Sequence, residues 1–92
     1  MFDLTNKSAI ITGARRGIGK GIALSLAEAG ADVLVSDIDL EDCKETCAEI
    51  EEKTGQKAVP FRCDVTKREE VQAMVEKAVG EFGKLDILVN NA

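Results

Sequence analysis

The chain has 92 residues, 45% of them hydrophobic and 32% charged, and its formal net charge is -5 at pH 7. This size fits one small domain or part of one, and the negative charge argues against a nucleic-acid surface, which needs clustered Lys and Arg. Histidine, tyrosine and tryptophan are absent, which excludes a Ser-His-Asp triad, a tyrosine acid and a histidine-rich metal site within these residues.

The first predicted strand is the apolar run at residues 8–12, which Gly13 ends. A helix is expected next, because apolar residues then recur at helical spacing, as Ile18, Ile22, Leu26 and Ala29. Gly30 is its predicted C-cap. Residues 32–36, DVLVS, form the second predicted strand.

Asp39 is placed to cap a second helix, which Gly55 ends. The predicted inner face of this helix consists of Leu40, Cys43, Cys47 and Ile50. The two cysteines of that face are interpreted as core residues rather than metal ligands. The third strand, residues 57–63, contains Pro60, which cannot donate to a neighbouring strand and therefore predicts an edge position.

Thr66 and Glu69 have the spacing of a capping box, which predicts the start of a third helix. The residues predicted to be buried on this helix are Val71, Met74, Val75, Ala78, Val79 and Phe82. Gly83 ends the helix, and residues 85–92, LDILVNNA, form the fourth predicted strand.

Strands that alternate with helices of this length predict parallel pairing through right-handed crossovers. The nearly continuous apolar strands indicate a sheet covered on both faces. We therefore predict an α/β, Rossmann-type three-layer sandwich, with a partial doubly wound parallel sheet of strand order 3-2-1-4.

A glycine-rich loop, TGARRGIGKG, occupies residues 12–21. A mononucleotide P-loop is excluded, because Ala14 replaces its first glycine and Gly21 its Mg²⁺-binding Ser or Thr. Gly21 is instead expected to permit close packing between helix and strand. A dinucleotide loop fits better, since glycines at 13, 17 and 19 link a strand to a helix whose N–H groups attract a pyrophosphate.

An acidic residue follows at the distance that this interpretation requires. Asp37 comes 18 positions after Gly19, near the roughly 20 expected for a carboxylate that binds the adenosine ribose. The spacing Thr12-Gly13-x-x-x-Gly17-x-Gly19 resembles the glycine motif of the short-chain dehydrogenase/reductase family. Two later motifs add to this resemblance, namely Asp64-Val65, which is similar to the family's adenine-contacting pair, and NNA at 90–92, which is similar to its Asn-Asn-Ala-Gly motif.

The resemblance covers essentially the whole chain and implies that residues 1–92 are the N-terminal, dinucleotide-binding portion of a single Rossmann-type domain. The implied cofactor-binding residues are Gly13, Arg15, Arg16, Gly17, Ile18, Gly19, Asp37, Ile38, Asp64, Val65, Asn90, Asn91 and Ala92. Asp37 favours NAD because it would repel a 2′-phosphate, whereas Arg16 could reach that phosphate and favours NADP. Direct repulsion outweighs an exposed, flexible arginine, so we expect NAD rather than NADP.

The resemblance also implies an NAD(P)-dependent oxidoreductase that transfers hydride between a nicotinamide cofactor and a small carbonyl or alcohol substrate. The family's catalysis resembles general acid chemistry by a tyrosine, with a Tyr-x-x-x-Lys lysine and a serine. Because the chain has no tyrosine, we expect no catalytic residue here, only the cofactor-binding half. The alternative is a free-standing, non-catalytic half-domain that binds nucleotides or self-associates through an open fourth strand.

The remaining expectations concern location and partners. The N-terminus lacks a signal peptide, and no run of about 18 apolar residues is present, so no membrane association is expected. Three cysteines without a signal favour reduced thiols in the cytoplasm. We expect no metal and no nucleic acid among the partners, but a dinucleotide, a small-molecule substrate and a second copy of the chain.

Overall fold

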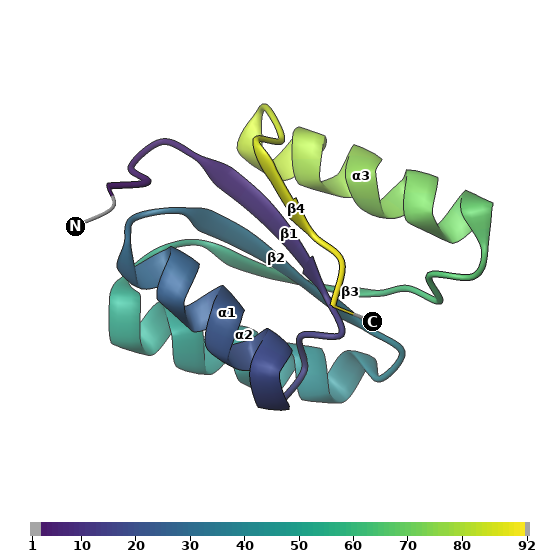
Figure 1. Cartoon of the computed structure of the whole chain (residues 1–92), viewed down its shortest axis with the longest axis horizontal. Coiled ribbons are helices and arrows are strands. Elements are labelled where there is room, and N and C mark those ends of the chain that lie inside the picture. Colours follow the sequence, from purple (N-terminus) through teal and green to yellow (C-terminus); the bar gives the residue numbers. More distant parts are fainter. Residues whose placement is uncertain (1–2, 92) are drawn as a thin grey trace.

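A computed structural model describes residues 3–91. Within them, seven elements alternate: β1 (Ser8–Thr12), α1 (Gly17–Glu28), β2 (Asp32–Asp37), α2 (Leu40–Thr54), β3 (Ala58–Arg62), α3 (Arg68–Phe82) and β4 (Ile87–Val89). The strands form one parallel sheet in the order β3-β2-β1-β4. Helices α1 and α2 cover one face and α3 covers the other (Figure 1), which confirms the predicted order and layers.

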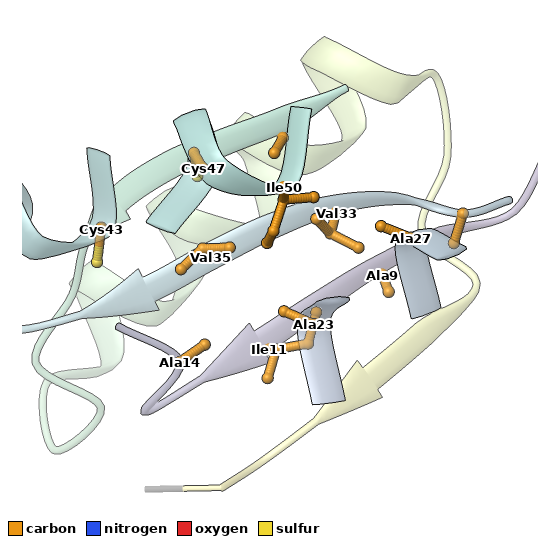
Figure 2. Close-up of a cluster of buried hydrophobic side chains, with 12 residues drawn as sticks. Ala9, Ile11, Ala14, Ala23, Ala27, Val33, Val35, Cys43, Cys47 and Ile50 are labelled. Atoms are coloured by element: carbon orange, nitrogen blue, oxygen red, sulfur yellow. The ribbon is translucent and has the colours of Figure 1, made fainter. Parts of the chain in front are cut away.

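Hydrophobic side chains fill the space on both faces of the sheet. Figure 2 shows the cluster under α1 and α2, where Ala9, Ile11, Val33 and Val35 of the strands meet Ala23, Ala27, Cys43, Cys47 and Ile50 of the helices. Ile10 and Leu34 point the other way and cluster with Met74 of α3. The two central strands are thus buried on both faces, as their apolar sequences predicted.

Both cysteines of α2 belong to this core, which confirms their interpretation as packing residues. Cys43 and Cys47 are free thiols and almost fully buried. Burial raises the pKa of Cys43 to about 11 and the pKa of Cys47 to about 12. Neither thiol is therefore a thiolate near neutral pH.

The inward face of α1 differs from the prediction. Its buried residues are Gly19, Ala23 and Ala27, whereas Ile18 is 79% exposed. The loop turns Ile18, the second residue of the helix, toward the outside, and small side chains then let the helix lie close to the sheet. The helix also ends one residue early, at C-cap Ala29, and Gly30 follows with φ 110°.

The two later helices also expose residues that were predicted to be buried. Leu40 is 37% exposed because it opens α2 next to the loop, beyond the sheet, and Val79 of α3 is 43% exposed. Helix α3 buries only Met74 and Ala78 completely. Its apolar stripe is wider than the surface that the described strands offer to it.

One predicted helix start is confirmed and another is wrong. The Asp39 side chain accepts the Asp42 N–H at 3.0 Å and caps α2 as expected. The capping box of α3 does not form, because Lys67 is the N-cap and contributes no side-chain hydrogen bond. The hydroxyl of Thr66 donates instead to Asp64 Oδ1 at 2.7 Å, within a turn that precedes the helix.

The two edges of the sheet affect the functional interpretation. Strand β3 pairs only with β2, so Pro60 occupies an edge strand as predicted. Strand β4 is shorter than predicted, and Asn90 and Asn91 follow it in irregular structure. In the described part of the chain, no helix is both long and apolar enough to cross a membrane.

Candidate functional site

The carboxyl ends of all four strands meet at one edge of the sheet. Parallel register aligns Thr12 with Ser36, and Asp37 with Arg62, so the residues that follow each strand become neighbours. In sheets of this type, ligands bind outside the carboxyl ends, where the strand order reverses. Here the reversal lies between β1 and β4.

The glycine loop leaves β1 with a conformation that requires glycine. Gly13 and Gly17 have φ values of 62° and 66°, in the left-handed region that other residues rarely adopt. A Cβ on Gly19 would collide with the Gly13 carbonyl and would lie 2.8 Å from Asn91 Nδ2. Gly19 is therefore the close-packing glycine, and the assignment of that role to Gly21 is wrong, since a Cβ there meets nothing within 4 Å.

The N-terminus of α1 is open to an anion. Arg16 is its N-cap but makes no side-chain capping bond, and no acidic residue lies in the first turn. The N–H groups of that turn have no intrahelical acceptor, and the helix dipole adds positive potential. A Cβ at Gly17 would meet nothing within 4 Å. The donor set and the space therefore suit a phosphate group.

Asp37 ends β2 beside this loop, and backbone donors hold its carboxylate. The Ile38 N–H donates to Oδ1 at 2.7 Å, and the Arg15 N–H donates to Oδ2 at 3.4 Å. The guanidinium of Arg15 adds an ion pair, with Nε 3.6 Å from Oδ1. The carboxylate is thus fixed in orientation and keeps lone pairs that can accept hydroxyl donors.

The arginine beside Asp37 also contacts two acids of the next helix, which the sequence interpretation missed. Nη1 of Arg15 lies 3.5 Å from Asp39 Oδ2 and 3.3 Å from Asp42 Oδ2. The Arg15 carbonyl in turn accepts the hydroxyl of Thr46 at 2.5 Å. The sequence does contain a signal for this cluster, namely three aspartates at positions 37, 39 and 42. Helix capping accounts for only one of them, Asp39.

A small hollow of about 80 Å³ opens between the ends of β1, β2 and β3. Its lining residues are Gly13, Ser36, Asp37, Ile38, Cys63, Asp64 and Val65. The Ser36 hydroxyl is buried and, within the described residues, has no hydrogen-bond partner. Ile38 and Val65 are 59% and 39% exposed. Two exposed apolar side chains at the rim of this hollow suit the faces of a flat base.

Asp64, on the third side of the hollow, is held by its own turn. Its Oδ1 accepts the Thr66 N–H at 3.0 Å as well as the Thr66 hydroxyl. These hydrogen bonds lower the pKa of the Asp64 carboxyl, so it is charged at neutral pH. The Asp64 N–H donates to Glu70 Oε1 at 2.9 Å and connects the turn to α3. Burial raises the pKa of the neighbouring Cys63 thiol.

The segment after β4 closes the site against the glycine loop. The Thr12 hydroxyl lies 3.1 Å from Asn90 Oδ1 and accepts the Asn91 N–H at 3.0 Å. Asn91 Nδ2 donates to the Gly13 carbonyl at 3.3 Å. Thr12, which was not predicted as a site residue, therefore links both sides. The predicted site residue Ala92 lies outside the described residues.

The predicted site residues within residues 3–91 thus gather at one edge of the sheet. The arrangement supplies backbone donors, a fixed carboxylate and a hollow with apolar flanks. Among the same residues, no group of three His, Cys, Asp or Glu side chains is placed to hold a metal ion. The donor set fits a nucleotide with phosphates, and the residues that would hold it lie at the carboxyl end of β2 and in the segments that follow β1, β3 and β4.

Comparison with known proteins gives a consistent assignment. The family described as short chain dehydrogenase matches residues 7–92. The chain is 49% identical to an Escherichia coli 7alpha-hydroxysteroid dehydrogenase over 89 residues, which is 97% of this chain and 34% of that protein. It is 48% identical to a Staphylococcus epidermidis diacetyl reductase, with 95% of this chain and 34% of that protein covered.

Solved structures agree with this assignment. A hydroxysteroid dehydrogenase from Escherichia coli superposes with a TM-score of 0.93 at 48% identity, over 98% of this chain and 38% of the other. A short-chain alcohol dehydrogenase-like protein from Sinorhizobium meliloti gives 0.92 at 49% identity, over 99% of this chain and 36% of the other. The chain spans about a third of the length of these relatives. It belongs to the short chain dehydrogenase family, oxidoreductases that use nicotinamide dinucleotide cofactors.

Proposed function

We propose that this chain binds the adenosine–pyrophosphate half of NAD(H), in preference to NADP(H), as part of an oxidoreductase. The parent reaction would transfer hydride between the nicotinamide and a carbonyl or alcohol carbon of a small substrate. One observation carries the preference for NAD. The Asp37 carboxylate lies between the glycine loop and the hollow of about 80 Å³ beside Ile38 and Val65, which we call the base hollow, and two backbone N–H groups hold the carboxylate in place.

The proposal assigns separate tasks to the site residues. The N–H groups at the start of α1 would bind the pyrophosphate, and Asp37 would accept the ribose hydroxyls. Ile38 and Val65 would flank adenine, with Asp64 at its edge. Asn90 would lie beside the ribose. The bound cofactor itself supplies or accepts the hydride.

Proton transfer is assigned to residues outside this chain. None of the 92 residues is a tyrosine, and the chain spans only 34% of its hydroxysteroid dehydrogenase relative. We therefore propose that a serine and a Tyr-x-x-x-Lys pair belong to the remaining length of the parent protein. Within this chain, the residues bind and orient the cofactor.

The experiment is a titration with NADH and NADPH, followed by the fluorescence of the cofactors themselves. We expect tighter binding of NADH, because Asp37 would repel a 2′-phosphate. Asp37→Ala should narrow the ratio of the two affinities by about tenfold, the equivalent of roughly 1.4 kcal/mol. Gly17→Val, whose side chain would fill the phosphate space, should lose both cofactors. An unchanged NADH/NADPH ratio in Asp37→Ala would show that Asp37 is not the ribose ligand.

A second proposal concerns self-association through β4. Leu88 is 58% exposed on this strand, and β4 pairs only with β1 within the described sheet. On the α1 side, an apolar hollow of about 330 Å³ is lined by Leu4, Ser25, Leu26, Ala29 and Ile87. A second copy that pairs at this edge would bury both. Sedimentation equilibrium should then give a dimer that Leu88→Lys dissociates, and a monomeric wild-type chain would contradict this proposal.

We also propose a cytoplasmic location. All three cysteines are free and buried, which suits a reducing compartment. Cell fractionation of the tagged protein tests this, and recovery in a secreted or membrane fraction would contradict it.

A further inference from the structure

A polar hollow of about 260 Å³ lies beside the candidate cofactor site, between the first turns of α1 and α2. These helices pack side by side on one face of the sheet (Figure 1). The hollow is lined by Arg15, Arg16, Lys20, Asp42, Glu45, Thr46 and Glu49. Its volume is that of several water molecules, enough for a phosphate group. Basic residues line its α1 side, and acidic residues line its α2 side.

The acids of α2 already engage two of the three cations. Lys20 Nζ lies 3.0 Å from Glu49 Oε2. The guanidinium of Arg15 contacts Asp42 at 3.3 Å and Asp39 at 3.5 Å. The Arg15 side chain is only 23% exposed, so these contacts are partly shielded from solvent. A phosphate that entered the hollow would have to compete with carboxylates for Arg15 and Lys20, whereas the third cation, Arg16, is exposed at the N-cap of α1.

Arg15 is also the connection between this hollow and Asp37. It lines the hollow, while its Nε lies 3.6 Å from Asp37 Oδ1. A ribose held by Asp37 would therefore carry its 2′-substituent next to the same guanidinium. For NAD the substituent is a hydroxyl, which can donate a hydrogen bond to the Asp37 carboxylate. For NADP it is a phosphate, for which Arg15 is the adjacent cation.

We propose that Asp42 is a specificity-determining residue of this site, because it holds Arg15 and keeps it from binding a 2′-phosphate. The inference rests on the proposed dinucleotide binding at Asp37. Asp42 touches neither the loop backbone nor the base hollow, and it acts through Arg15. Selectivity against NADP thus depends on two acids in two elements: Asp37 repels the phosphate, and Asp42 withholds Arg15, which together with Arg16 could otherwise compensate.

The charge balance supports this role. Asp37, Asp39 and Asp42 surround one guanidinium, so the cluster carries an excess of negative charge. Removing the charge of Asp42 lowers this excess. It also removes the nearer of the two carboxylates that contact Arg15 Nη1. The Asp42 backbone N–H, which Asp39 caps, is retained in Asp42→Asn, so α2 keeps its start.

Glu45 provides a matched control. It lines the same hollow and is exposed on the same helix, one turn further along. It is not one of the carboxylates that contact Arg15, which are Asp37, Asp39 and Asp42. Glu45→Gln therefore removes the same charge from the hollow without releasing Arg15, and it separates a general electrostatic effect from the specific contact.

The test uses adenosine 2′,5′-bisphosphate and 5′-AMP, each competing with NADH on wild-type chain, Asp42→Asn, Glu45→Gln, Arg15→Ala and the Arg15→Ala/Asp42→Asn double variant. We expect Asp42→Asn to improve bisphosphate binding relative to AMP by about five- to tenfold, the size of an ordinary net hydrogen bond. Glu45→Gln should shift this ratio by less than about twofold. In the Arg15→Ala background, Asp42→Asn should have no comparable effect.

The outcomes separate the two claims. If wild-type chain binds neither NADH nor AMP, the proposed function fails before the inference is reached. If NADH binds but Asp42→Asn leaves the bisphosphate/AMP ratio unchanged, the inference is wrong while the proposed function stands. An equal effect of Glu45→Gln, or an effect of Asp42→Asn that persists without Arg15, also overturns it.

Discussion

The N-termini of α1 and α2 are alike in position but opposite in chemistry. Both helices begin after strands that end at the same edge of the sheet. α1 begins with Gly17, has no side-chain cap and has no acid in its first turn. α2 is capped by Asp39 and carries Glu41 and Asp42 in its first turn. One helix dipole is thus left free, and the other is neutralised by its own side chains.

The difference shows how one sheet edge can separate ligand binding from stability. An uncapped helix start loses the roughly 1 kcal/mol that a good cap provides, and an anion can supply that interaction instead. The capped start of α2 needs no ligand, and its acids are free to hold Arg15. Three predictions test whether this division is real.

The largest effect is expected at the glycines of α1. Gly19→Ala places a methyl group against the Gly13 carbonyl, so we expect a loss of about 2–3 kcal/mol in the free energy of unfolding. Gly21→Ala, in open space on the same helix, should gain about 0.5–1 kcal/mol. Urea denaturation measures both. Equal effects of the two variants would mean that the tight contact at Gly19 is absent in solution.

A smaller effect is expected at the helix caps. Asp39→Ala should cost about 1 kcal/mol of stability, because the Asp42 N–H loses its acceptor. Lys67→Ala, at the N-cap of α3 where no side chain caps, should change stability by less than about 0.5 kcal/mol. The same urea titrations compare them. A cost at Lys67 as large as that at Asp39 would contradict the assigned caps.

The smallest effect is a dependence of stability on pH that originates at Cys43. Burial first, and then the charges of Asp37, Asp39 and Asp42, raise its pKa to about 11. A thiol whose folded pKa is raised stabilises the protein below its ordinary pKa of about 8.5. This contribution is lost as the pH rises from there toward 11.

We therefore expect Cys43 to account for a stability loss below about 1 kcal/mol by pH 9. Cys43→Ala should unfold with a flatter dependence on pH between 8 and about 10 than wild-type chain does. Urea midpoints across this range provide the measurement. Parallel pH profiles for the two chains would mean that the thiol titrates normally in the folded state.

The fold could be predicted from the sequence because its main signals are local. The apolar runs of β1 and β2 and the edge proline, Pro60, each required only neighbouring residues. The errors arose where a neighbouring turn decided the outcome. Ile18 fits a helical stripe, yet the loop turns it outward, and Thr66 bonds to Asp64 instead of the helix.

The site was predictable in outline but not in its side-chain contacts. Spacing indicated the loop and Asp37, and the family resemblance implied the Asp64–Val65 pair. The ion pairs of Arg15 with Asp39 and Asp42 depend on how the start of α2 lies against the loop, which no sequence period encodes. For the same reason the close-packing role of Gly19, rather than Gly21, depends on the fold of the loop, which brings the Gly13 carbonyl and Asn91 beside Gly19.

The pairing of β1 with β4 also sets an order of events in folding. The Ser8 N–H donates to Asp86 Oδ2 at 2.9 Å, and these residues are 78 positions apart in the sequence. Residues of β1 and their partners in β2 are separated by only about a third as many positions. In the unfolded chain, closing the longer loop costs about 1 kcal/mol more entropy. We therefore expect the β4 side of the site to form later and to open more readily than the contact between the glycine loop and Asp37, which amide hydrogen exchange would measure.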